Sequence, residues 1–180
     1  MRNVKLFVDL SSTDTGLTIW DIETNEIFCY SLKIKEFKNE HDKNNRALLK
    51  IRYLDKIFNN ITNTLNITEI VMESPFVNKT FLRSSEMILK MHGFLLHKFC
   101  DLQFSFITPS EIKKIVSGKG NACKEDIIDS VKGSGFNLDI DEKSNDNIYD
   151  SFAVMIAYMD IHEITITADK PLIVKSIKQI

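Results

Sequence analysis

Two short apolar segments that each end in one carboxylate constrain the fold of this chain most strongly. The first runs from Val4 to Leu10 and carries Asp9 near its end, and the second covers residues 70–73 and ends at Glu73. Such apolar runs are typical of strands that are buried on both faces in the middle of a sheet. Because ligands of open α/β sheets gather at the carboxyl ends of strands, we expect Asp9 and Glu73 to meet if these two strands are neighbours.

The remaining elements predict a single α/β domain. Strands are marked by β-branched and aromatic residues between turn signals, and helices by apolar residues spaced by three and four. In chain order we expect strands over 4–10, 15–20 and 26–34, a helix over 42–65, a strand over 70–73, a helix over 84–100, a strand over 102–107, and helices over 110–116, 124–132 and 145–158. This order favours a five-stranded mixed sheet with helices on both faces and the first strand in the centre, formed by residues 1–160, with 161–180 as an extended tail of the same unit.

The last predicted helix carries two acids that can join the strand ends. At 100° per residue, Asp146 and Asp150 share one arc with two alanines, whereas the large apolar side chains fall on the opposite arc. The small alanines allow this helix to approach the sheet closely with its carboxylates pointing at the sheet edge. We therefore take Asp9, Glu73, Asp146 and Asp150 as the candidate catalytic and metal-binding residues, although each acid alone also fits an ordinary strand-end or helix-start position.

A cluster of these carboxylates needs a cation. Two unit charges about 4 Å apart repel by about 4 kcal/mol at an effective dielectric near 20, so three or four ionised acids would destabilise one another. Oxygen ligands without histidine or cysteine favour a hard ion, Mg²⁺ or Mn²⁺. Two such ions about 3.5–4 Å apart form a clamp for phosphoryl transfer. The acids thus indicate a two-metal site for this chemistry.

Local basic patches, and not the overall charge, must attract a polyanion to this chain. The 180 residues include 23 Lys and Arg and 25 Asp and Glu, a net charge of -2, so there is no global positive field. Residues 112–124 contain four lysines and no acid, and residues 74–85 contain one lysine, one arginine and no acid. The candidate residues in these two segments for binding a polyanion such as nucleic acid are Phe76, Lys79, Arg83, Lys113, Lys114, Lys119 and Lys124. Phe76 fits either stacking on an unpaired base or burial behind Pro75.

Cysteine use and hydropathy indicate a reducing compartment and no membrane partner. The three cysteines are widely spaced and form no C-x-x-C pair, so neither a disulfide framework nor a zinc site is indicated. The N-terminus lacks the features of a signal peptide, and no apolar run approaches the roughly 20 residues that span a bilayer. We expect a cytoplasmic protein.

Four motifs in the same order resemble the RuvC Holliday-junction resolvases, which belong to the RNase H-like nucleases. They are Val8-Asp9 followed by Thr15-Gly16, the acid-containing segment 72–79, the lysine-bearing segments 108–113 and 118–124, and Asp150-Ser151-Phe152-Ala153. The resemblance covers residues 4–158 and implies an RNase H-like fold. It further implies a Mg-dependent crossover junction endodeoxyribonuclease that uses two Mg²⁺ or Mn²⁺ ions, works as a homodimer, and cuts four-way and other branched DNA junctions by paired hydrolysis.

Two departures distinguish the chain from the cellular members of this family. Leu-Ser-Ser follows Asp9 where those members usually have Pro-Gly-Ser, and the family's three-residue ligand spacing would place Asn147 opposite Asp150. Helical periodicity favours Asp146 instead, with Asn147 as a substitute or supporting ligand. With a composition rich in Ile, Lys and Asn, the departures resemble a bacteriophage-type member, which would act in the cytoplasm of a bacterial host cell. The helix at 87–99 occupies the family's interface position, and its Met and Phe side chains fit either a dimer surface or a core stripe.

Three other functions share parts of this pattern. A branched-DNA-binding protein that does not cleave would need the same basic patches, and an RNase H that acts on RNA–DNA hybrids would need the same acids. Actin-like ATPases and sugar kinases have a similar opening motif, but they place the nucleotide between two such domains, for which 180 residues are too few. Cleavage of a four-way junction, compared with a linear duplex, a fork and a hybrid, separates a resolvase from the first two.

Overall fold

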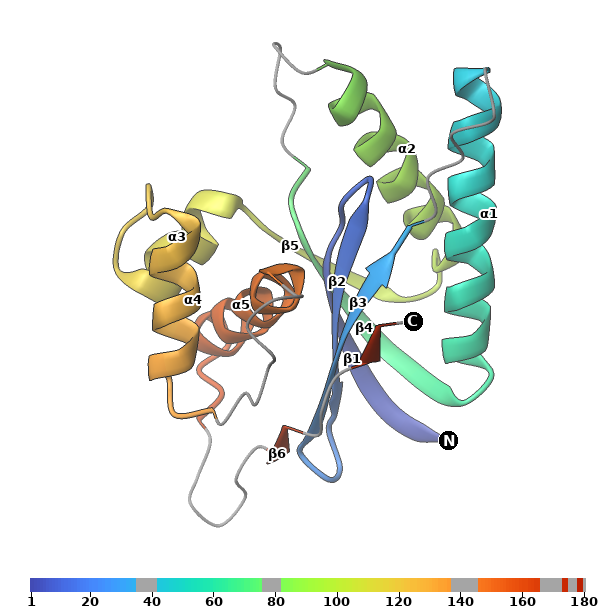
Figure 1. The fold of residues 1–180 in the computed structure, drawn as a ribbon. Helices are drawn as coiled ribbons and strands as arrows, with labels where there is room; N and C mark the ends of the chain where they lie inside the picture. Colours follow the sequence, from blue (N-terminus) through green and yellow to red (C-terminus); the bar gives the residue numbers. More distant parts are fainter. Residues whose placement is uncertain (35–41, 76–81, 137–145, 166–172, 175–177, 180) are drawn as a thin grey trace.

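A computed structural model describes residues 1–34, 42–75, 82–136, 146–165, 173–174 and 178–179 of the chain (Figure 1). The described strands form one mixed sheet in the order β5-β4-β1-β2-β3-β6, and β7 also pairs with β3. The strands are β1 (Arg2–Asp9), β2 (Asp14–Asp21), β3 (Glu26–Lys33), β4 (Leu65–Glu73), β5 (Gln103–Ile107), β6 (Ile173–Val174) and β7 (Lys178–Gln179). The predicted five-stranded mixed sheet with β1 in its centre is confirmed, and two short strands of the tail extend it.

The apolar sequence of β1 explains its central place. This strand runs antiparallel to β2 and parallel to β4. Leu6 and Val8 belong to the core on one face of the sheet, and Phe7 belongs to the core on the other face. All three side chains are fully buried, as expected for a strand that is covered on both faces.

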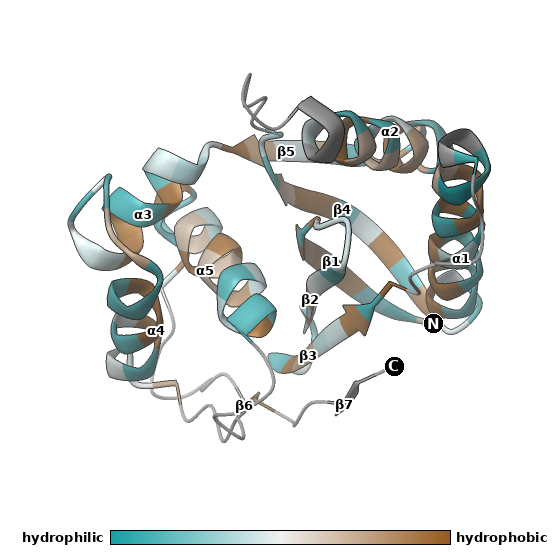
Figure 2. Cartoon of the chain, turned by 45° about the horizontal axis from the view of Figure 1, so that its top comes forward, coloured by the Kyte–Doolittle hydropathy of each residue, from teal (hydrophilic) through white to brown (hydrophobic). Residues whose placement is uncertain are grey.

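Helices cover both faces of the sheet, as the sequence predicts. They are α1 (Lys43–Thr62), α2 (Leu82–Lys98), α3 (Pro109–Ser117), α4 (Lys124–Gly133) and α5 (Asp146–Ile161). α1 and α2 lie on one face, whereas α5 lies on the other face with α3 and α4 outside it (Figures 1 and 2). Because α5 is enclosed by the sheet and by these two helices, both of its predicted arcs are largely buried. In the part of the chain that the structure describes, no helix has the length and hydropathy needed to cross a membrane.

The first long helix is shorter than the apolar spacing predicts. α1 ends at Thr62, and Leu65 begins β4, where it pairs with Arg2 of β1. The chain turns between these elements, and the N–H of Thr64 donates to the carbonyl oxygen of Ile61. Leu65 therefore continues the helical spacing only by coincidence. β4 has 9 residues and pairs with β1 from Arg2 to Val8.

The apolar stripe of α2 belongs to the core. Met91, Leu95 and Phe99 are buried between this helix and the sheet. The large apolar side chains that α2 leaves exposed are instead Leu89 and Leu96, which are 44% and 41% exposed. Of the two interpretations of the helix at 87–99, the core stripe is correct for its buried side chains.

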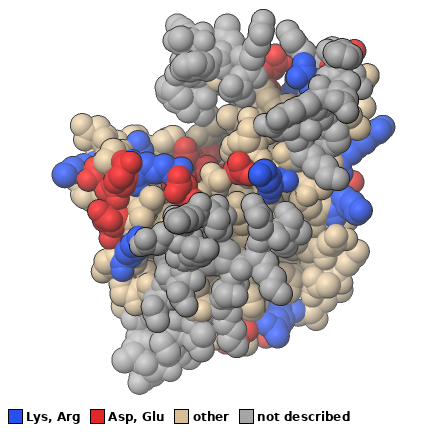
Figure 3. Space-filling view, viewed as in Figure 1, with Lys and Arg blue, Asp and Glu red and all other residues tan. Residues whose placement is uncertain are grey.

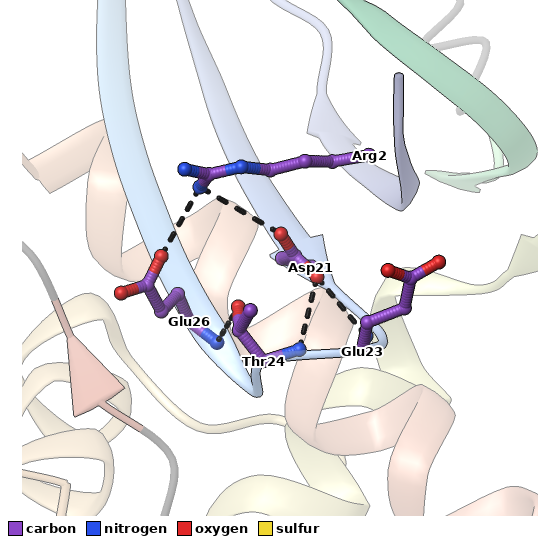
Figure 4. Close-up of polar contacts among 5 residues, drawn as sticks. All are labelled: Arg2, Asp21, Glu23, Thr24 and Glu26. Atoms are coloured by element: carbon purple, nitrogen blue, oxygen red, sulfur yellow. Dashed lines mark hydrogen bonds and ion pairs between the residues drawn. The ribbon is translucent and has the colours of Figure 1, made fainter.

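Asp21 holds the turn between β2 and β3 and is 1% exposed. Its Oδ1 accepts hydrogen bonds from the N–H groups of Glu23 (3.0 Å) and Thr24 (3.1 Å), and the guanidinium of Arg2 lies 3.7 Å from its Oδ2 (Figure 4). Asp21 pairs with the beginning of β1, whereas Asp9 is the last residue of that strand. The acidic residues of this turn therefore lie at the opposite ends of the strands from Asp9.

The tail that follows α5 adds to the outer edge of β3. β6 pairs with Glu26 and Ile27, and β7 pairs with Tyr30 and Ser31, both in parallel orientation. The sequence predicts an extended tail without identifying its partner. The structure supplies that partner, since backbone pairing covers the strand edge that the hairpin leaves open.

Candidate active site

β1 and β4 bring two acids to the same edge of the sheet. Asp9 is the last residue of β1 and Glu73 is the last residue of β4. The two strands are parallel neighbours in which Val8 pairs with Met72. Both residues are partly buried, so they lie at the strand ends on the boundary between the core and the surface.

α5 brings a third acid to this edge through a close approach to β2. A Cβ atom on Gly16 would lie 1.9 Å from the carbonyl oxygen of Asn147, so only glycine fits at this position. Two residues further along β2, the hydroxyl oxygens of Thr18 and Ser151 lie 2.9 Å apart in the core. These contacts fix the first turns of α5 on the sheet and place Asp150 close enough to the end of β1 for their charges to interact.

The three carboxylates repel one another. Burial, and after it the negative charges of Glu73 and Asp150, raise the pKa of Asp9 to about 8. Burial and the charge of Asp150 raise the pKa of Glu73 to about 7, and burial also raises the pKa of Asp150. Without a bound cation, the site therefore retains protons near neutral pH. Coupled carboxylates of this kind, beside a cleft, mark a candidate functional site.

Two lysines supply counter-charge to these acids. The Nζ of Lys124 lies 3.4 Å from Oδ2 of Asp150 and 3.4 Å from Oδ2 of Asp146. The charge of Lys113 opposes the rise in the pKa of Glu73 that burial and Asp150 cause. The side chain of Asp146 is 60% exposed, compared with 28% for Asp150, so Asp146 lies at the rim of the site. Figure 3 shows acidic and basic side chains next to one another on the part of the surface that carries α3 and α4.

A cleft of about 690 Å³ opens beside the acids. Its walls include Glu73, Asp150 and Lys113, together with the apolar side chains of Ile112 and Ile127. The end of β4, the start of α3, α4 and α5 therefore form one concave surface. A cleft with charged groups on an apolar base is typical of ligand sites.

A capping box fixes where α3 begins and thereby positions its lysines. The N–H of Glu111 donates to Oγ1 of Thr108 (3.3 Å), and the N–H of Thr108 donates to Oε2 of Glu111 (3.0 Å). Pro109 occupies the first turn, and Gly118, with φ of 77°, ends the helix. Thr108 and Ser110 also line the cleft. Sequence reasoning gave these two residues no role, although the T-x-x-E signal for a helix start is visible in the sequence.

The acids suit a hard divalent cation in their chemistry. Asp9, Glu73 and Asp150 offer oxygen ligands, and the ammonium of Lys124 already places one positive charge between Asp146 and Asp150. Among the residues that the structure describes, however, no three His, Cys, Asp or Glu side chains are spaced to hold a single ion. The predicted two-metal site is therefore not preformed at ligand distance. Because ionised carboxylates repel, a divalent ion would draw them closer together.

The two candidates for a fourth ligand differ in their contacts. Asp146, which helical periodicity favours, shares the ammonium of Lys124 with Asp150. Asn147 is partly buried and presses its main-chain oxygen against β2 at Gly16. Asp146 is thus the acid with a direct electrostatic link to the site.

The predicted DNA-binding residues differ in where the structure places them. Lys113 and Lys124 lie beside the acids. Lys114 and Lys119 are exposed, on α3 and on the loop that follows it. Phe76 and Lys79 lie outside the described residues, and so does the side chain of Arg83. The basic surface that can be described is therefore the one formed by α3, its following loop and the start of α4.

Comparison with known proteins gives a result at the level of the fold. No family model matches this chain, and no curated protein matches it either. The structure of T. thermophilus RuvC in complex with Holliday junction substrate aligns with a TM-score of 0.64 and 14% identity, over 89% of this chain and 95% of that chain. A second Thermus thermophilus RuvC structure aligns with a TM-score of 0.59 and 15% identity, over 89% of this chain and 96% of that chain. The chain therefore has the RNase H-like α/β fold that its motifs predict.

Proposed function

We propose that this chain, which shares the fold of T. thermophilus RuvC, is a structure-selective endonuclease that hydrolyses phosphodiester bonds in four-way and other branched DNA junctions. One observation carries the proposal: Asp9, Glu73 and Asp150 come from three separate elements and interact electrostatically beside a cleft. Coupled carboxylates of this kind suit metal-dependent phosphodiester hydrolysis. The choice of substrate is supported by the T. thermophilus complex, which contains a Holliday junction.

In this proposal Asp9, Glu73 and Asp150 hold two Mg²⁺ ions, for which Mn²⁺ can substitute, and Asp146 or Asn147 completes the ligand set. When bound, such ions activate a water molecule and stabilise the leaving oxygen. The chain itself supplies the fixed positions of the acids at two strand ends and on α5. It also supplies the positive charges of α3 and α4 that face the negative charge of a phosphate.

DNA binding in this proposal depends on local positive charge, because the net charge of the chain is -2. Lys113 lines the cleft, and the other lysines of α3, its following loop and α4 lie on the same elements, so phosphates near the cut can contact them. The residues proposed to contact DNA are Phe76, Lys79, Arg83, Lys113, Lys114, Lys119 and Lys124. Gly118 and Gly120 carry no side chain that would hinder a phosphate oxygen from approaching this loop.

The proposal includes a homodimer that pairs two active sites. Leu89 and Leu96 are 44% and 41% exposed and lie seven residues apart on α2. His92 lies between them in sequence and packs against Phe106 of the edge strand β5, with ring centroids 6.3 Å apart. Phe106 is itself 44% exposed, so α2 and β5 share an apolar surface that a second copy can cover. A two-fold interface would make the two cuts in a junction equivalent.

The proposal also assigns the chain to a bacteriophage-type member of this fold group that acts in the cytoplasm of a bacterial host. Two features of the sequence support this assignment. Leu-Ser-Ser replaces the usual Pro-Gly-Ser after Asp9, and the composition is rich in Ile, Lys and Asn.

Cleavage of a synthetic four-way junction in Mg²⁺ tests the proposed function. We expect paired nicks near the junction centre, much slower cleavage of a linear duplex, a fork or an RNA–DNA hybrid of the same sequence, and no cleavage in EDTA. Glu73→Gln should abolish cleavage and still bind the junction, because it leaves the lysines unchanged. Asp101→Asn is the matched control and should cut normally, because Asp101 is exposed and precedes the start of β5, whereas the candidate acids lie at the carboxyl ends of their strands.

Each other outcome of this assay identifies a different function. Junction binding without cleavage by the wild-type protein would favour a branched-DNA-binding protein. Cleavage of the hybrid alone would favour an RNase H.

A further inference from the structure

Lys124 occupies the position between two of the candidate metal-binding acids. Its Nζ lies 3.4 Å from Oδ2 of Asp146 and 3.4 Å from Oδ2 of Asp150. Lys124 is the first residue of α4, and the start of that helix is held by a hydrogen bond from the N–H of Cys123 to Oδ2 of Asp126 (3.0 Å). The Lys124 side chain is 44% exposed, so its flexible stem has room to turn the ammonium away from the acids.

Lys124 differs from its basic neighbours in how it meets the acids. Among the described residues, it is the basic side chain that forms ion pairs with Asp146 and Asp150. Lys113 instead lines the cleft and acts on Glu73 through its charge. The ammonium of Lys124 offsets part of the negative charge of the acids. A divalent ion bound to Asp150 would lie close to this ammonium, and two cations about 4 Å apart repel each other.

We propose that Lys124 is an internal counterion that competes with divalent metal ions for Asp150. In the metal-free protein the ammonium stabilises the acids. When an ion binds, the ammonium leaves Asp150 and becomes available to a phosphate group of the DNA. This inference rests on the proposed function, since it concerns the same acids. Because coupling between two binding sites is reciprocal, a phosphate that attracts Lys124 strengthens metal binding, and metal and DNA bind cooperatively.

The affinity for Mn²⁺, measured by calorimetry on the metal-free protein without DNA, tests this role. Lys124→Met keeps most of the apolar stem and removes the charge, and we expect it to lower the dissociation constant about tenfold, the effect of a change of roughly 1.4 kcal/mol. Lys124→Gln should give the same result if the methionine variant does not fold. Lys124→Arg keeps a cation beside Asp150 and should bind Mn²⁺ as the wild type does.

Lys114→Met is the matched control, because it removes one exposed lysine of the same basic surface without breaking an ion pair to the site acids. Its Mn²⁺ affinity should stay within about twofold of the wild type. Equal or weaker Mn²⁺ binding by Lys124→Met, compared with Lys114→Met, would overturn the counterion role and leave the proposed function intact. Failure of every protein, including the wild type, to bind Mn²⁺ would overturn the proposed metal-dependent function together with this inference.

Discussion

Asp9→Asn should stabilise the metal-free protein at pH 8, although it removes a candidate catalytic group. Burial and the charges of Glu73 and Asp150 raise the pKa of Asp9 from 3.8 to about 8. The folded state therefore holds this proton more tightly than the unfolded state does. The resulting contribution to stability is complete at acidic pH and is lost as the pH rises from about 4 to about 8. Asparagine has no charge to bury at any pH.

The magnitude of this effect follows from the pKa of Asp9. A change of one in pKa corresponds to about 1.4 kcal/mol, so the rise in the pKa of Asp9 from 3.8 to about 8 corresponds to a cost of at most about 6 kcal/mol for ionising Asp9 in the folded state. Because Asp9 is partly exposed, solvent screening reduces this cost. We expect Asp9→Asn to raise the free energy of unfolding by about 2 kcal/mol at pH 8, which raises the melting temperature by about 4–8 °C. At pH 5 the gain should fall below about 1 kcal/mol.

Urea unfolding of both proteins in EDTA, at pH 5 and at pH 8, measures this difference. Asp101→Asn is the control and should change the free energy of unfolding by less than about 0.5 kcal/mol. Adding Mn²⁺ at pH 8 should reverse the order of stability, because the ion stabilises the wild type by binding to its acids. A raised pKa of Asp9 would be contradicted if Asp9→Asn were less stable than the wild type at pH 8 without metal, or if the difference were the same at both pH values.

Two further predictions concern the packing of α5 and the basic surface. Gly16→Ala should lower the free energy of unfolding by about 3 kcal/mol in urea, because its Cβ would lie 1.9 Å from a main-chain oxygen of α5. Gly93→Ala, in α2 with open space around it, should be stabilising by about 1 kcal/mol, and equal effects at the two glycines would contradict the close approach. Lys113→Ala with Lys119→Ala should weaken junction binding and reduce the slope of log affinity against log salt by about 2, as gel-shift titrations can show. An unchanged slope would remove these lysines from the DNA surface.

The sequence is most informative about the two strand ends. An apolar run that ends in a single acid leaves few places for that acid in an α/β sheet, so the common position of Asp9 and Glu73 follows from pattern alone. The phase of the last helix similarly brings Asp150 to the same edge. The pattern does not show how closely α5 approaches β2. That distance depends on Gly16 and on the hydroxyl contact between Thr18 and Ser151.

Features that depend on strand register could not be predicted from the sequence. Lys5 interrupts the apolar run of β1, and its Nζ lies 2.6 Å from Oε2 of Glu69 and 2.6 Å from the hydroxyl oxygen of Tyr158. This arrangement requires β1 and β4 to pair Lys5 with Glu69, next to an irregularity in the ladder. For the same reason, the sequence wrongly predicts that the first long helix extends to Leu65. The spacing of Leu65 from the apolar residues of α1 suits a helix, but Leu65 pairs with Arg2 and belongs to β4.

The proposed function depends on Asp9, Glu73 and Asp150 forming one site for divalent ions. Anomalous diffraction from crystals of the protein grown with Mn²⁺ tests it most directly. We expect a manganese signal enclosed by these three carboxylates, with the ammonium of Lys124 withdrawn from Asp150. A manganese signal elsewhere on the protein, or none at this sheet edge in a protein that cuts DNA with Mn²⁺, would contradict it.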